Sequence, residues 1–340
     1  MMKAIEIIGA GLAGLALANA LQRDGVPVNL YEAGTLPRHR VCGEFICGRG
    51  ADALKALGLG HSLAGAATHR STVWTIGGRE TLRKELPQPA IGLSRWTLDQ
   101  RLADTFIQAG GQLYLNTRRT TAADGIATVH CNGRKACSSD WIGLKLHCRD
   151  LSTAADLELH LGQDGYVGLS KIEDDQVNVC ALFKQRPALK AKRIEWLDLY
   201  LRHSGLGSVA ERLQAADIVE HSHCGVAGVQ FAQIPATNES RLLLGDAYSV
   251  IPPFTGNGMS IALEAAELAY PFLLAYAEGS CSWPESVRQI NCAQHAAFDS
   301  RLRAARWLHP WIHSTSRQRL LGRLAGAGLL PFSLLYSLTH

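Results

Sequence analysis

The sequence predicts an α/β fold: a doubly wound domain, an antiparallel sheet inserted into it, and a helical region at the C-terminal end. Three observations predict this fold. Residues 3–32 place a glycine-rich turn between a strand-like run and a helical pattern. Residues 241–273 repeat that order with a second glycine-rich turn. Residues 141–183 alternate apolar and polar side chains with the period of two that is typical of half-buried strands.

The first element is a β-α-β unit. Residues 3–8 form a short apolar run of the kind found in buried parallel strands. Residues 13–23 repeat apolar side chains at helical spacing, and Gly25 ends that helix. Residues 26–31 form a second strand-like run. The spacing therefore predicts two parallel strands joined by one helix.

Gly9, Gly11 and Gly14 give the pattern G-x-G-x-x-G between the first strand and the helix. The first glycine permits a tight turn, the second lets the backbone approach a pyrophosphate, and the third lets helix and strand pack closely. The helix N-terminus then presents its partial positive charge to the phosphates. Glu32, at the end of the second strand, can accept hydrogen bonds from an adenosine ribose. We therefore predict a site for NAD or FAD, with further contacts at Leu12, Ala13 and Ala33.

The second glycine-rich turn follows a run of leucines that ends at Gly245 and Asp246. A loop containing Pro253 leads to Gly256-Asn257-Gly258, and an alanine-rich helix begins near Met259. A carboxylate at a strand end can accept hydrogen bonds from a polyol chain. Bare N–H groups at a helix start favour an electron-rich ring edge.

This segment resembles the "GDA…P…G.G" motif of FAD-dependent oxidoreductases of the para-hydroxybenzoate hydroxylase-like superfamily, which includes the group A flavoprotein monooxygenases and the geranylgeranyl reductases. The resemblance implies a Rossmann-like FAD/NAD(P)-binding domain and FAD as the cofactor. It implies that Asp246 contacts the ribityl chain or the neighbouring phosphate region. It also implies that residues 256–258 direct backbone N–H groups to flavin N1 and O2, which would stabilise reduced flavin.

Two other segments bear on this resemblance: one matches the superfamily and one departs from it. "LSRWTLDQRLADTF" resembles its Arg-x-x-Leu helix, which implies that Arg95 contacts the FAD phosphates or the flavin edge; the alternative is an ordinary helix N-terminal residue. "TVHCNGRKA" stands where the superfamily has Asp-Gly-x-x-Ser, with Asn132 and Ala136 in place of the Asp and Ser. This change weakens the case for ordinary NAD(P)H-dependent hydroxylation. The electron donor is then NAD(P)H bound transiently, or a separate electron-donor protein.

The stretch "LPRHRVCGEFICGRG", residues 36–50, is open to three interpretations: a metal clip, a redox pair, or a loop that lies against a flat ligand. Its position after Glu32 favours the third. Arg38 and Arg40 are then candidate partners for the pyrophosphate, and the alternative for each is a solvated charge. "RVCGEF" resembles the Cys-Gly motif of geranylgeranyl reductases, which implies that Cys42 and Gly43 lie near the flavin. Cys42 is the one candidate catalytic residue.

The resemblance leaves three functions open. We favour an oxidoreductase of the geranylgeranyl-reductase-like branch that acts on a small apolar substrate, which is isoprenoid, aromatic or polyketide-like and belongs to secondary metabolism. The alternative is a monooxygenase that hydroxylates such a substrate with O₂. The third is a flavin-binding accessory protein without turnover. The chain contains a single G-x-G-x-x-G, so we expect no second dinucleotide domain.

The composition is that of a globular protein. The net charge of +4 over 340 residues gives no reason to expect a nucleic acid partner. The nine cysteines are odd in number and form no C-x-x-C pair, which favours a reducing, cytoplasmic setting. His221 and His223 beside Cys224 have no second ligand group at a suitable spacing, so we expect no metal site.

Residues 300–340 differ from the rest of the chain because they contain six arginines and no acidic residue, among tryptophans and many leucines. Such a segment can rest on an anionic membrane surface. The alternative is a pair of core-packing helices with a solvated arginine face.

We expect three parts. The FAD-binding domain would be discontinuous, formed by residues 1–70, 90–140 and 225–275. The substrate-binding sheet would comprise residues 71–89 and 141–224. The helical C-terminal region would comprise residues 276–340.

Overall fold

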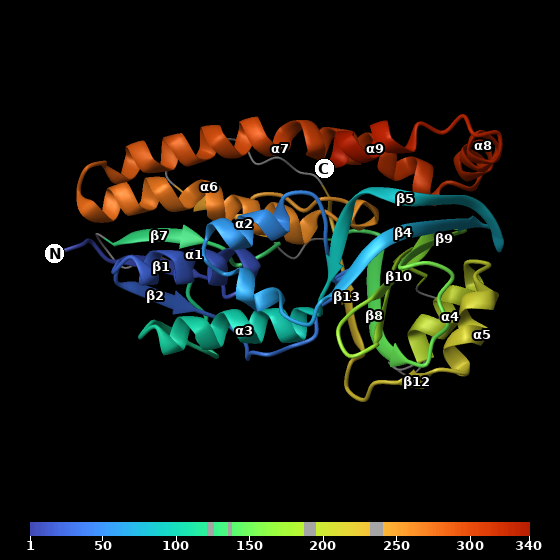
Figure 1. The fold of residues 1–340 in the computed structure, drawn as a ribbon, viewed down its shortest axis with the longest axis horizontal. Coiled ribbons are helices and arrows are strands. Elements are labelled where there is room, and N and C mark those ends of the chain that lie inside the picture. The colour runs from blue at the N-terminus through green and yellow to red at the C-terminus, as the bar shows by residue number, and fades with distance from the viewer. Residues whose placement is uncertain (121–125, 135–137, 187–194, 232–240) are drawn as a thin grey trace.

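The computed structural model describes residues 1–340 except 121–125, 135–137, 187–194 and 232–240 (Figure 1). Its first sheet has five strands in the order β14-β7-β1-β2-β6, and every pairing is parallel. These strands are β1 (Ile5–Ile8), β2 (Val28–Tyr31), β6 (Gln112–Tyr114), β7 (Ala127–His130) and β14 (Leu242–Leu243). Because strands are added on one side of β1 and then on the other, a crevice forms at the carboxyl ends of β1 and β7, where such sheets bind ligands.

Four helices pack around this sheet: α1 (Leu12–Arg23), α2 (Gly50–Ala56), α3 (Arg95–Gln108) and α6 (Gly258–Glu278). The first ten residues of α1 are all buried, which explains why its sequence is almost entirely apolar. Helix α6 packs against α1, α2 and α7. Among the described residues, α6 is the one helix long and apolar enough to cross a membrane, but its packing and buried face fit a core helix.

The second sheet has nine strands, in the order β12-β8-β11-β10-β9-β4-β5-β3, with β13 also paired to β8. Their bounds are β3 (Phe45–Ile46), β4 (Ala67–Ile76), β5 (Arg79–Gly92), β8 (Trp141–Arg149), β9 (Leu157–Gly162), β10 (Gly165–Lys171), β11 (Val177–Lys184), β12 (Asp217–Ile218) and β13 (Cys224–Ala227). The sheet is mixed rather than purely antiparallel, because β4 and β9 pair in parallel. The chain passes through the first domain between these two strands, and parallel pairing requires such a crossover.

The expected α/β fold with an inserted second sheet is confirmed. Some strands of that sheet extend beyond the expected ranges: β4 begins at Ala67, β5 ends at Gly92, and β3 lies within residues 1–70. The short 3₁₀ turns are Gly60–Leu63, Gly245–Ala247 and Pro253–Thr255.

The two faces of the second sheet have different partners. One face packs against α4 (Trp196–His203) and α5 (Gly207–Gln214), with Leu144 and Leu146 of β8 in that cluster. Because side chains alternate along a strand, Lys145 and His147 lie on the other face, toward the first domain. The sequence of β8 therefore places two ionisable side chains between the two parts of the molecule.

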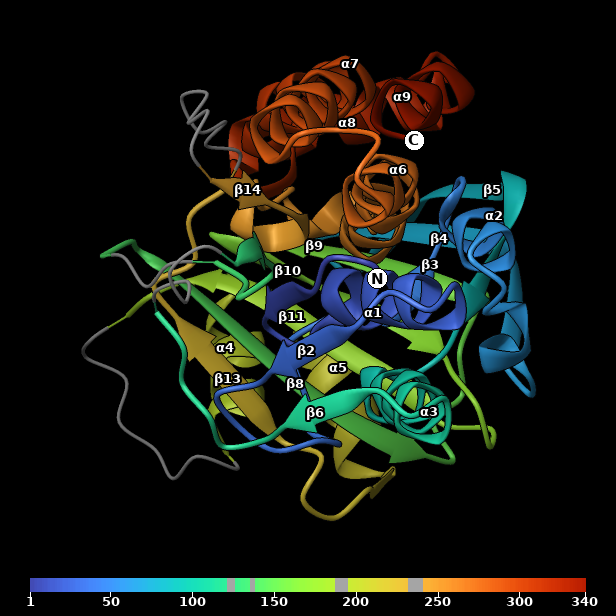
Figure 2. The same cartoon turned by 90° about the vertical axis from the view of Figure 1, so that its left-hand side faces the viewer.

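The C-terminal region forms α7 (Trp283–His313), α8 (Thr315–Gly326) and α9 (Phe332–Thr339). Figure 1 shows α7 running above α6, with α8 and α9 near the second sheet. Figure 2 shows α6 between these helices and the β1-α1-β2 unit. Ile312 of α7 and Leu321 of α8 pack with Leu159 and Leu161 of β9 in one apolar cluster. The C-terminal helices thus cover part of the inner face of the second sheet.

Candidate functional site

The glycine-rich turn after β1 is tightly packed at two positions and open at the third. Gly9 has φ of +108°, and a Cβ there would lie 2.3 Å from the carbonyl oxygen of Cys131. A Cβ on Gly14 would lie 2.0 Å from the oxygen of Gly9. Gly11, the N-cap of α1, has nothing within 4 Å of an added Cβ. The open space therefore lies at the N-terminus of α1, where backbone N–H groups can meet an anion. Leu12 and Ala13 are buried beside it.

Glu32 is 5% exposed and ties this turn to the loop after β2. Its Oε2 accepts a hydrogen bond from the backbone N–H of Ala10 at 3.0 Å. Its Oε1 accepts from the N–H of Gly34 at 3.1 Å and from Nη2 of Arg38 at 2.9 Å. The carboxylate thus has protein partners of its own at the place where we expected a ribose contact. Ala33 is exposed.

Two arginines meet at the fully buried Asp99 in the first turns of α3. Arg95 binds both carboxylate oxygens of Asp99 at 2.8 Å, and Nε of Arg40 lies 3.4 Å from Oδ2. Burial and the nearby Arg95 lower the pKa of Arg40. Within the described residues, Nε and Nη2 of Arg40 are buried without a hydrogen bond. These two donors face carboxylates, Nε that of Asp99 and Nη2 that of Glu32 at 4.0 Å, but they make no hydrogen bond with them, so the guanidinium can still bind an oxyanion.

Asp246 lies in the same region. Solvent reaches its side chain, yet desolvation by the surrounding protein raises the pKa of its carboxyl overall. Arg95, Arg40 and Arg134 act in the opposite direction and only partly offset this rise. A side chain that is both accessible and surrounded lines a recess rather than a convex surface. Gly245 has φ of +61°, and a Cβ added there would lie 3.2 Å from the Cβ of Ala13, so this turn packs closely on the start of α1. The recess therefore joins the first glycine-rich turn to Asp246.

The residues present fit a dinucleotide such as FAD. The open helix start at Gly11 and the guanidinium of Arg40, two donors of which make no hydrogen bond, suit a pyrophosphate. The accessible carboxylate of Asp246 suits the hydroxyl groups of a ribityl chain. Asn132 lies beside the Gly9 turn, whereas Ala136 lies outside the described residues.

The second glycine-rich loop is held against two other segments. A Cβ on Gly256, which has φ of +68°, would lie 1.9 Å from the ring of Phe45. Asn257 is 1% exposed, and its side-chain amide donates to the carbonyl oxygen of Thr339 in α9. Since that side chain is occupied, the groups left for a ligand are backbone N–H groups near Gly258, the first residue of α6. Pro253 opens the short turn before this loop, and Met259 is buried.

The Cys42–Gly43 turn is fixed to the second sheet. The carbonyl oxygen of Gly43 accepts hydrogen bonds from Ser170 of β10 at 2.7 Å and from Asn178 of β11 at 2.8 Å. Asn178 also donates to the carbonyl oxygen of Cys42 at 3.0 Å. Burial raises the pKa of Cys42, so its side chain is a neutral thiol. Cys47 is a buried free thiol that bonds the carbonyl oxygen of Gly256.

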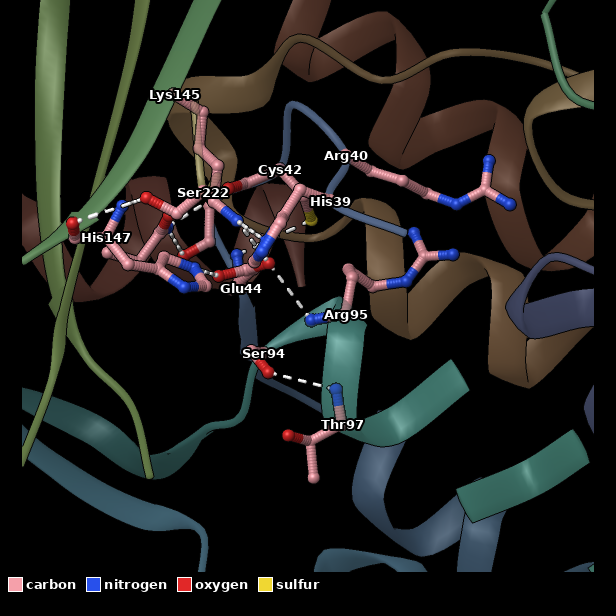
Figure 3. A network of polar contacts seen from close by, with 12 residues as sticks. His39, Arg40, Cys42, Glu44, Ser94, Arg95, Thr97, Lys145, His147 and Ser222 are labelled. Carbon is pink, nitrogen blue, oxygen red and sulfur yellow. Dashed lines mark hydrogen bonds and ion pairs between the residues drawn. The ribbon is translucent and has the colours of Figure 1, made fainter. Parts of the chain in front are cut away.

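A buried ionic cluster that was not predicted from the sequence lies beside this turn (Figure 3). It comprises Glu44, Lys145, His147 and His39, and is called the Glu44 cluster below. Oε1 of Glu44 accepts from Nζ of Lys145 at 3.0 Å, and Oε2 lies 2.5 Å from Nε2 of His147. The side chains of Glu44 and Lys145 are fully buried. Lys145 also lies 3.3 Å from Nδ1 of His39.

Electrostatic interactions within the Glu44 cluster shift the pKa values of Glu44 and His39. Burial would raise the pKa of Glu44, but Lys145 and the hydrogen bond with His147 lower it overall. Burial and Lys145 lower the pKa of His39 to about 4, so this ring is neutral at pH 7. In the sequence, Lys145 and His147 alternate with Leu144 and Leu146 along β8, a pattern that fits a solvent-exposed strand face equally well. No group of three metal-binding side chains occurs within the part of the chain that the structure describes.

Comparison with known proteins gives relatives of low identity and broad coverage. Residues 7–58 match the NAD(P)-binding Rossmann-like domain family. The menaquinone reductase of Mycobacterium tuberculosis is 23% identical, over 79% of this chain and 76% of that protein. The mitochondrial squalene epoxidase 2 of Arabidopsis thaliana is 24% identical, over 76% of this chain and 52% of that protein.

Among solved structures, Klebsiella pneumoniae HpxO complexed with FAD and uric acid superposes with a TM-score of 0.75. That superposition covers 98% of this chain and 97% of HpxO at 15% identity. The expected fold is confirmed by this likeness, and the FAD-bound neighbour agrees with the cofactor that the resemblance implied.

Proposed function

We propose that this FAD-dependent oxidoreductase, which has the para-hydroxybenzoate hydroxylase-like fold, reduces a carbon–carbon double bond of an isoprenoid-like substrate. Such a substrate needs an apolar site next to the flavin. The observation that carries the proposal is a cavity of about 280 Å³ beside the second glycine-rich loop.

This cavity is lined almost entirely by apolar side chains. Phe45, Phe254 and Thr255 form the end near the glycine-rich loop. Trp74 and Leu157 of the second sheet form one wall, and the three C-terminal helices form the other. Phe45 is also the residue whose ring fills the space over Gly256. An apolar substrate in the cavity would therefore lie next to the loop that the resemblance assigns to the flavin edge.

The residues of the chain bind, orient and exclude water. Bound FAD would supply the redox chemistry that no side chain can provide. The start of α1 and Arg40 would hold the pyrophosphate, and Asp246 would hold the ribityl chain. The apolar walls keep water from the reaction, as such chemistry needs. Cys42 remains the candidate catalytic residue, because its neutral thiol stands in the turn that the resemblance places beside the flavin.

Two observations support the reductase. "RVCGEF" resembles the Cys-Gly motif of geranylgeranyl reductases, and the chain is similar to a menaquinone reductase along most of its length. The second candidate function is oxygenation of such a substrate with O₂. It is favoured by the likeness to squalene epoxidase 2, of which the chain spans about half.

Flavin reoxidation separates these functions. The purified protein is loaded with FAD, reduced anaerobically, and mixed with polyprenyl, aromatic and polyketide compounds. A reductase reoxidises its flavin without O₂ and yields a saturated product. A monooxygenase reoxidises only when O₂ is admitted, with an oxygenated product. A protein that binds no FAD would overturn both. Adding NADH or NADPH in a parallel experiment tests whether a nicotinamide is the donor or whether a donor protein is needed.

We also propose that the C-terminal helices contact an anionic membrane surface. Trp307 is 63% exposed and also lines the cavity, and Leu329 is 69% exposed. With six arginines and no acidic residue in residues 300–340, this surface suits anionic lipid. Cosedimentation with vesicles tests it: binding to vesicles rich in anionic lipid and not to neutral ones is expected. Equal absence from both would refute the contact.

A further inference from the structure

The carboxylate of Glu44 joins three parts of the chain. Oε1 accepts from Nζ of Lys145 in β8 and from the backbone N–H of Arg95, the first residue of α3. Oε2 binds His147, also in β8. Glu44 itself directly follows the Cys42–Gly43 turn. One side chain therefore connects the second sheet, the start of α3 and the turn expected at the flavin (Figure 3).

The backbone of Glu44 is equally constrained. Its φ of +55° lies in the left-handed region, which costs a residue with a Cβ about 1 kcal/mol or more. In this conformation its N–H points to Sγ of Cys42 at 3.4 Å. Its carbonyl oxygen accepts from the N–H of Leu93 at 3.0 Å, just before α3. The N–H and the carbonyl group of Glu44 thus contact the Cys42–Gly43 turn and the segment before α3, which its side chain also connects.

Stability alone does not account for these charges. A buried ion pair loses its hydration, and apolar side chains of similar volume often give an equally stable protein. What the Glu44 cluster adds is a fixed relative position for two neighbouring groups: Cys42, and Arg95, whose guanidinium acts to lower the pKa of Asp246. An apolar replacement would fill the same volume without directing the N-terminus of α3.

We propose that Glu44 is a positioning residue for the flavin. Held by Lys145 and His147, it sets the Cys42–Gly43 turn against the N-terminus of α3, so that Cys42 and Arg95 meet FAD in one fixed arrangement. The contacts with FAD are made by those two residues, and Glu44 acts through them. The inference rests on the proposed function only in taking FAD as the ligand.

The chain offers a matched control on the opposite face of the same sheet. Glu158 of β9 has a side chain that is 1% exposed, and it binds His160 at 2.7 Å and Arg212 at 2.9 Å. Its neighbours Leu159 and Leu161 pack toward the C-terminal helices, so Glu158 and His160 point away from the recess. Glu158 is therefore a buried acid of similar surroundings, and among the described residues it has no hydrogen bond or ion pair with the turn or with α3.

The experiment compares wild type with Glu44→Gln, Glu44→Gln/Lys145→Met and Glu158→Gln. FAD dissociation constants are measured by flavin fluorescence, with the visible spectrum and reduction potential of the bound flavin and the melting temperature of the FAD-free protein. The double variant removes both buried charges, so its FAD-free fold should survive. Both Glu44 variants are expected to bind FAD about tenfold more weakly or worse, with an altered flavin spectrum. Glu158→Gln should melt earlier but bind FAD as wild type does.

The outcomes separate this inference from the proposed function. If wild type binds FAD, and the folded double variant binds it with wild-type affinity, spectrum and potential, Glu44 has no positioning role. If Glu158→Gln weakens FAD binding as much as the Glu44 variants, the effect is one of general stability, and the inference is overturned. If wild type binds no FAD, the proposed function itself fails.

Discussion

Asn257 and Thr339 join the second glycine-rich loop to helix α9 at the C-terminal end of the chain. The buried side-chain amide of Asn257 donates to the carbonyl oxygen of Thr339, so the start of α6 holds the end of α9. That carbonyl belongs to the last turn of a helix, where acceptors have no partner within the helix. The contact therefore closes the apolar cavity at the end where the flavin edge is expected.

Replacing Asn257 by Ala should loosen α9. Removal of the donor leaves a buried carbonyl without a partner, which costs about 1–3 kcal/mol locally. Hydrogen exchange over residues 332–339 should become faster, while exchange in α1 stays unchanged. Ser337→Ala is the control, because Ser337 bonds only within α9 and its side chain is exposed. Unaltered protection of α9 would contradict the role given to Asn257.

Gly11 and Gly14 should respond oppositely to alanine. A Cβ at Gly11 meets open space, so Gly11→Ala should fold with a normal melting temperature and bind FAD more weakly. A Cβ at Gly14 would collide with the backbone of Gly9, so Gly14→Ala should destabilise the FAD-free protein by about 2 kcal/mol or more. Thermal melting and FAD titration of both variants measure this. Full FAD affinity in Gly11→Ala would argue against a ligand at the start of α1.

Cys42→Ala should change turnover or regioselectivity while FAD stays bound. The turn is held by Ser170 and Asn178 through backbone carbonyl groups, so removing the thiol leaves its anchors in place. Cys47→Ala is the comparison, since Cys47 is a buried thiol in a packed position. Product analysis and steady-state rates are the measurements. Kinetics identical to wild type would make Cys42 a spacer.

The protein should lose stability as the pH falls from about 6.5 toward 4. Burial lowers the pKa of His39, His309 and His340 to about 4 each. Between pH 6.5 and 4 the unfolded chain binds protons that the folded protein does not, so acid favours unfolding. His309 packs against Trp141 and Phe254, so His309→Phe should keep this packing and make the melting temperature depend less steeply on pH over this range. An equally steep decline in that variant would show that other groups govern it.

The β-α-β unit was predictable because each of its signals is local. A strand, three glycines, a helix and an acid follow one another within thirty residues, and the structure has strands and a helix there. The parallel pairing of β4 with β9 was not predictable from alternation, because period-two patterns are the same in either direction. The partners of Glu32 were missed because Arg38 could equally have faced a phosphate or solvent.

The Glu44 cluster lay beyond sequence reasoning for a different reason. Its members come from positions 39, 44, 145 and 147, and nothing in their spacing indicates that a loop and a distant strand meet. The sequence contained only a lysine and a histidine that alternate with Leu144 and Leu146 along one strand, and that pattern fits a solvent-exposed face as well as a buried polar contact.

The same junction limits how this protein can be recombined. A chimera that takes residues 141–227 from a relative imports β8, and with it whatever stands at positions 145 and 147. If those positions are apolar, the resident Glu44 becomes a buried acid without its cation, the most costly form of such a mismatch. Exchange of the second sheet to change substrate preference should therefore give a folded protein only when Glu44, Lys145 and His147 all come from the same parent.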